Sequence, residues 1–139
     1  MNPQRVIPEV QNLHELIRER QSPVMSYDLQ TDLTVTIQFL KFPEGWQNSD
    51  GSRFGDVIFD LSPLYPRKQP KVYVSDDMLY EGQSPHVLYA RSSAPPGFTK
   101  YCIHRLSEWN PDKHSLTTMF NLLEVSLENP HSKNPLQEA

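Results

Sequence analysis

The segment with the clearest capacity for chemistry runs from Tyr101 to Pro111 and contains Cys102, the only cysteine of the chain. A thiol can accept an activated acyl group as a thioester and then pass it to an amine. A free cysteine is also often a small buried apolar residue without a chemical role. Trp109 follows shortly, and we interpret its large ring as packing that fixes the cysteine segment against the next helix.

A histidine lies close to this thiol in the sequence. His104 follows Cys102 by two residues, so both side chains point to the same side of an extended segment. Cys102, His104 and His114 could be imagined as metal ligands, but their spacing matches no recurrent zinc pattern and there is no second cysteine. No glycine-rich phosphate loop is present either. We therefore predict neither a metal site nor a resident cofactor.

Length, charge and cysteine content restrict the class of protein. A chain of 139 residues is expected to form a single domain, residues 1–139. The net charge of −4, without a Lys/Arg cluster, argues against nucleic acid or a membrane surface as a partner. No apolar run could span a bilayer, and no secretory signal follows the first residues. One cysteine cannot form an internal disulfide, so we expect a cytoplasmic protein.

Two amphipathic helices are predicted, one near each end of the chain. Pro8 suits the first turn of the first helix, where a missing N–H costs nothing, and the helix should end near residues 21–23. Glu9 is expected on its polar face, opposite an apolar stripe of Val6, Ile7, Val10, Leu13, Leu16 and Ile17. Ser115 is a plausible N-cap of the second helix. The apolar stripe of that helix consists of Leu116, Met119, Phe120, Leu123 and Leu127.

Alternating apolar residues between these helices predict four strands, at residues 24–29, 33–39, 54–61 and 71–74. Leu33, Val35, Ile37 and Phe39 are expected to share one face of the second strand, and Val57, Phe59 and Leu61 one face of the third. Alternation indicates one covered and one wetter face. The predicted fold class is therefore α+β, an antiparallel four-stranded meander with a helix packed on one side.

Prolines interrupt the pattern before and after the fourth strand. Pro66 and Pro70 hold the chain extended without ladder hydrogen bonds, which predicts a crossover at a sheet edge. Residues 75–100 show no convincing periodicity and contain several prolines and glycines. We expect a long loop there, of the kind that is usually functional or disordered in a small domain.

This order of elements resembles the ubiquitin-conjugating-enzyme (UBC) fold, and the motifs match in the same order. Tyr65-Pro66 with Pro70-Lys71-Val72 is similar to the Tyr-Pro…Pro-Pro-Lys-Val crossover of that family, with Gln69 in place of one proline. Cys102-Ile103, followed by Trp109-Asn110-Pro111, resembles the active-site Cys-Leu and the Trp-Ser-Pro of the family. Pro130 through Pro135-Leu136 resembles its Pro-Asn-x-x-x-Pro-Leu. The similarity covers nearly the whole chain.

The departures from the family pattern are informative. The family's His-Pro-Asn triplet has its nearest analogue in Ser84-Pro85-His86, with a longer loop before the cysteine. His86 thus stands where the family has an oxyanion-stabilising Asn. Asn134 replaces an acidic residue found before Pro-Leu in many members. The terminal helices of eukaryotic members have no counterpart. These features are more similar to the divergent bacterial branch, whose members occur in antiphage operons.

The resemblance implies a conjugating enzyme whose catalytic residues are Cys102 and His86. Cys102 would carry a ubiquitin-like modifier, or a modifier-like protein C-terminus such as that of a nucleotidyltransferase, as a thioester. His86 would donate a hydrogen bond to the oxyanion or act as a base for the amine, with His104 as the second choice. A separate activating enzyme would use the ATP. The alternative is a non-catalytic module of the same fold that binds a modifier or a peptide.

Overall fold

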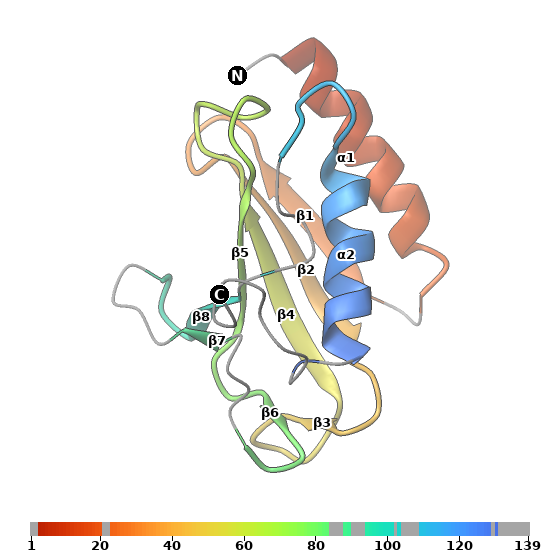
Figure 1. Ribbon diagram of the computed structural model, residues 1–139, viewed down its shortest axis with the longest axis vertical. Coiled ribbons are helices and arrows are strands. Elements are labelled where there is room, and N and C mark those ends of the chain that lie inside the picture. Colours follow the sequence, from red (N-terminus) through yellow and green to blue (C-terminus); the bar gives the residue numbers. More distant parts are fainter. Residues whose placement is uncertain are drawn as a thin grey trace, which may run out of the picture.

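Two helices pack against each other on one face of an antiparallel sheet in the computed structural model (Figure 1). The helices are α1, Pro3–Ile17, and α2, Leu116–Glu128, drawn in red and blue. An N-terminal helix, an antiparallel sheet and a C-terminal helix confirm the predicted α+β class. The structure describes residues 3–20, 23–83, 88–89, 94–101, 103, 109–128 and 130, with only the backbone of 88–89.

Four strands form the predicted meander. These strands are β1 (Val24–Asp28), β2 (Thr34–Lys41), β4 (Phe54–Asp60) and β5 (Lys71–Ser75), and each pairs antiparallel with the next. β8 (Phe98–Tyr101) and β7 (Leu88–Tyr89) extend the sheet beyond β5, in the order β1-β2-β4-β5-β8-β7. β3 (Trp46–Gln47) and β6 (Leu79–Tyr80) form a separate two-stranded sheet.

The prediction of a loop without secondary structure over residues 75–100 was wrong. The described part of this region contains β6, β7 and the start of β8. Strands of two to four residues contain at most two full periods of side-chain alternation, so sequence periodicity cannot reveal them. β8 matters most for the candidate site, because it ends at Tyr101, directly before Cys102.

The start of α1 also differs from the prediction. The helix begins at Pro3, so Pro8 lies inside it and not in its first turn. Pro3 is equally compatible with a first helical position, which explains why the pattern was ambiguous. The start of α2 was predicted correctly, because Leu116 is its first residue and the carbonyl oxygen of Ser115 accepts from the Met119 N–H at 3.1 Å.

The core lies between the two helices and the sheet. The apolar stripe predicted for α2 is buried in full, and so are the three β4-side residues Val57, Phe59 and Leu61. The stripe of α1 is buried at four of its six positions, whereas Ile7 is exposed and Leu16 half-buried. The buried apolar residues of both helices and of β4 join Val35 and Ile37 of β2 in one cluster. The helices therefore cover the sheet face that carries the apolar alternation.

A β-bulge breaks that alternation in β2. The register between β2 and β4 shifts between Ile37 and Leu40, and Phe39 adopts a positive φ of 60°. As a result Phe39 is 57% exposed and Leu40 is 2% exposed, so the prediction that Phe39 shares the buried face was wrong. An extra residue in one strand reverses the side of every residue after it.

Neither of the two described helices is long and apolar enough to cross a membrane.

Candidate functional site

The residues predicted to do the chemistry fall outside the described part of the chain. Cys102, His86, His104 and Asn134 all lie among the residues that the structure does not describe. The described residues immediately before and after Cys102 are buried, Tyr101 at 1% and Ile103 at 7% exposure. The described residues that hold this segment on either side therefore define the candidate site.

Tyr101 anchors the segment at its upstream end. Its phenol is buried beneath α2, and its hydroxyl shares a 2.7 Å hydrogen bond with Oγ of Ser126. Tyr101 is also the last residue of β8, whose register with β5 pairs Lys100 with Tyr73. A strand on one side and a helix on the other thus fix the residue next to Cys102.

Trp109 anchors the segment at its downstream end. Its Nε1–H donates to the carbonyl oxygen of Pro66 at 2.6 Å, and its ring centroid lies 6.1 Å from that of Tyr65. The prediction that Trp109 packs the segment against the α2 stripe is therefore only partly correct. The indole packs on the edge of the core, but its hydrogen bond joins the segment to the proline-containing connection between β4 and β5. Because β4 pairs directly with β5, the predicted crossover at a sheet edge was wrong.

Glu9 of α1 lies behind this contact and not on the polar face where it was predicted. It is 9% exposed, and its Oε1 accepts hydrogen bonds from the Tyr65 hydroxyl and from the Leu116 N–H, the latter at 3.1 Å. Its Oε2 accepts from Nε of Arg5 at 2.7 Å. The spacing held a signal: position 9 is three residues after Val6 and four before Leu13, on the apolar stripe.

The electrostatics of this cluster follow from its burial. Burial, the hydrogen bond to Glu9 and the negative charge of Glu9 all raise the pKa of the Tyr65 hydroxyl, so this phenol is a proton donor at neutral pH. The N–H of Leu116 is one of the unpaired donors at the start of α2, where a negative charge is favoured. Glu9 therefore caps α2 from a different helix.

His114 has a structural role in this arrangement. Its Nδ1 accepts a 2.9 Å hydrogen bond from the N–H of Asn110, and its ring lies 5.5 Å from the indole of Trp109. Its carbonyl oxygen accepts a second hydrogen bond, from the Arg5 guanidinium. Among the residues that the structure describes, no group of three or more His, Cys, Asp or Glu side chains could hold a metal ion.

A small hollow opens beside the cysteine segment. It measures about 230 Å³, and the described residues that line it come from the β4–β5 connection, β5, β8, the residue after Cys102 and α2: Gln69, Pro70, Lys71, Val72, Lys100, Tyr101, Ile103 and Met119. Tyr101 and Ile103 are the sequence neighbours of Cys102, so the described residues on both sides of the cysteine line this hollow.

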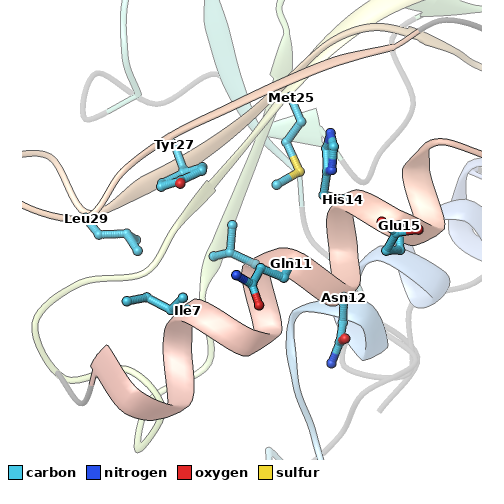
Figure 2. Close-up of a pocket in the computed structure, with 9 residues that line it drawn as sticks. Ile7, Gln11, Asn12, His14, Glu15, Met25, Tyr27 and Leu29 are labelled. Atoms are coloured by element: carbon cyan, nitrogen blue, oxygen red, sulfur yellow. The ribbon is translucent and has the colours of Figure 1, made fainter.

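A larger groove of about 690 Å³ lies between α1 and β1 (Figure 2). The polar side chains in it come from α1, including Gln11 and His14, whereas Met25, Tyr27 and Leu29 come from the β1 side. Among the described residues, Tyr101, Ile103 and Trp109, which hold the cysteine segment, do not line this groove.

Comparison with known proteins adds no assignment: no protein-family model, no curated protein and no solved structure matches this chain.

Proposed function

We propose that this protein is a ubiquitin-conjugating-enzyme-like acyl carrier that holds a ubiquitin-like modifier, or a modifier-like protein C-terminus, on Cys102. The observation that carries the proposal is the hydrogen bond from Trp109 Nε1 to Pro66 O. It joins two of the four motifs on which the UBC resemblance rests, although 43 residues separate them in the chain. The element order and the meander are compatible with that fold.

The described residues at both ends of the reactive segment are held by hydrogen bonds. Tyr101 is held by Ser126, and Trp109 is held by Pro66, so the chain from 102 to 108 begins and ends at anchored residues. Positioning of this kind is a large part of catalysis when the incoming group is already activated. The proposal requires the thiol to be open to a flexible C-terminal tail. The side chains of Tyr101 and Ile103 are buried, so neither of them occupies the surface from which such a tail would approach.

The reaction would exchange one thioester for another and then form an amide. The Cys102 sulfur attacks the donor's thioester carbonyl, the donor's carbon–sulfur bond breaks, and the donor thiol leaves with the proton. An amine then attacks the new thioester, and Cys102 leaves as the thiol. His86 is our candidate for the donor that stabilises the oxyanion or for the base that takes the amine proton, with His104 as the second candidate.

The proposal implies partners and a biological setting. An activating enzyme would supply the thioester at the expense of ATP, so no cofactor is proposed for this chain. The modifier would be a ubiquitin-like protein or the C-terminus of a nucleotidyltransferase. Through the resemblance to the bacterial branch, we propose a cytoplasmic role in antiphage defence.

A labelled peptide with a C-terminal glycyl thioester tests the carrier function without the natural partners. We expect a covalent adduct that thiol reductants remove, a reductant-resistant ester on Cys102→Ser, and no adduct on Cys102→Ala. An equal amount of adduct on Cys102→Ala would reject the proposal. Native Cys102 should also react with a maleimide. Labelling only after unfolding would instead favour the non-catalytic binding module.

Variants of His86 separate its two candidate roles. His86→Ala should lower the rate of amide formation about a hundredfold, the effect of losing one oxyanion donor. His86→Asn can donate a hydrogen bond but cannot accept a proton, so it should retain activity only if the role is that of a donor. His14→Ala on α1 is the matched control, and His104→Ala tests the second candidate.

A further inference from the structure

The buried carboxylate of Glu9 connects three parts of the chain that are far apart in sequence. Tyr65, which donates to it, is 56 residues away, and Leu116, which also donates, is 107 residues away. Arg5 binds the other oxygen from the preceding turn of α1. One side chain thus joins α1, the β4–β5 connection and the first residue of α2.

Two routes lead from this carboxylate to Trp109. In the first, Tyr65 contacts the indole ring directly, and its neighbour Pro66 accepts the Nε1–H of Trp109. In the second, Arg5 donates from its Nη2 to the carbonyl oxygen of His114 at 2.9 Å, and the His114 ring lies 5.5 Å from the indole ring of Trp109. The two routes form a closed circuit, so a displacement of Glu9 changes both.

We propose that Glu9 is a positioning residue of the candidate site, which sets the placement of Trp109 and thereby of the segment that carries Cys102. The inference deepens the proposed function and rests on it. A charged residue is a costly way to fill this position, since Val6, Val10 and Leu13 on the same stripe are buried without one. Hydrogen bonds to a carboxylate are directional, so Glu9 fixes each of its three donors at a defined place, which an apolar contact cannot do.

Glu9→Gln tests the inference with little change in shape. The amide oxygen can still accept from Tyr65 or Leu116, but the amide nitrogen cannot accept from Arg5. Glu15→Gln on the same helix is the matched control, because Glu15 is exposed and pairs only with Arg18 at 3.1 Å among the contacts that the structure describes. Tyr65→Phe is the second variant, since it removes one hydroxyl from the circuit and keeps the ring.

The first readout is the indole N–H resonance of Trp109 in an NMR spectrum of the whole protein. The chain has two tryptophans, and Trp46 donates to Leu127 at the opposite end of α2. We expect Glu9→Gln and Tyr65→Phe to shift the Trp109 signal and leave the Trp46 signal in place, with Trp109→Phe used for assignment. An unmoved Trp109 signal in both variants would overturn the inference.

The second readout is the rate of thioester transfer to Cys102 from the peptide thioester. Glu9→Gln should lower the maximal rate about tenfold or more, the scale expected for a misplaced reactive group, with KM changed less than about twofold. Glu15→Gln should match the wild-type protein. A Trp109 shift together with an unchanged maximal rate would also overturn the inference.

The two proposals fail in different ways. If the wild-type protein forms no adduct, the proposed function is wrong, whereas the Trp109 resonance still reports whether Glu9 places the indole. If the wild-type protein is active and Glu9→Gln loses only thermal stability, the carrier function holds and the positioning role is rejected. If Glu9→Gln fails to fold, Tyr65→Phe decides the question alone.

Discussion

The indole Nε1–H of Trp46 donates a hydrogen bond to the carbonyl oxygen of Leu127 at 2.8 Å, across 81 residues of sequence. Trp46 is fully buried, and its ring makes edge contacts with Phe42 and Tyr80 at centroid distances of 5.2 and 5.6 Å. The carbonyls in the last turn of a helix have no partner within the helix. Trp46 therefore satisfies one of them at the end of α2.

Trp46→Phe should destabilise the protein. The phenyl ring keeps most of the apolar contact but leaves a buried carbonyl oxygen without its donor, which typically costs about 1–3 kcal/mol. Urea unfolding followed by circular dichroism measures the change. Trp109→Phe is the control at a half-buried site, where water can replace the lost donor, so its cost should be smaller. A larger loss from Trp109→Phe would contradict this account.

The raised pKa of Tyr65 predicts a dependence of stability on alkaline pH. The folded-state pKa lies above the ordinary tyrosine value of 10.0, so the unfolded chain releases this proton first. The contribution of Tyr65 is therefore complete below about pH 10 and is lost as the pH rises above that value. The difference in free energy of unfolding between the wild-type protein and Tyr65→Phe should be constant from about pH 7 to 9 and then shrink. A difference that stays constant up to about pH 11 would show that Tyr65 is not protonated more tightly in the fold.

The bulge in β2 predicts that alanine substitutions at two neighbouring apolar residues differ strongly in their cost to stability. Leu40→Ala should cost about 2–5 kcal/mol, because it removes a buried side chain from the core. Phe39→Ala should change the free energy of unfolding by less than about 1 kcal/mol, because this ring is largely exposed. Denaturant titration of the two variants gives the comparison. An uninterrupted period of two would give the reverse order.

The same two residues show where sequence reasoning about the fold was sufficient and where it was not. In β4 and α2 the spacing is regular, and each predicted core residue is buried. At Phe39 the chain departs from regularity, and hydrophobicity cannot say which of two adjacent apolar residues turns inward. Glu9 presents a related difficulty. A glutamate is normally assigned to the polar face of a helix, and only the hydrogen-bond donors around it, which the sequence does not show, explain why it is buried.

The candidate site was predictable only in part, because the residues that form it lie far apart in the sequence. Tyr65-Pro66 and Trp109 could each be singled out from sequence, but the hydrogen bond between them could not, because no local pattern encodes a contact across 43 residues. The roles of Cys102 and His86 stay predictions, since both residues lie outside the described part of the chain.

The long-range attachment of Glu9 also has a consequence for the order of assembly. β1, β2, β4 and β5 each pair with strands close to them in sequence, so the loops between them close at small entropic cost. The contacts of Glu9 with Tyr65 and Leu116 span 56 and 107 residues, so they form only when distant parts of the chain have come together. We expect the carboxylate to engage after the rate-limiting barrier. Stopped-flow traces of Glu9→Gln should then show faster unfolding with an unaltered refolding rate. A slowed refolding rate would show that the hydrogen bonds of Glu9 are already formed in the folding transition state.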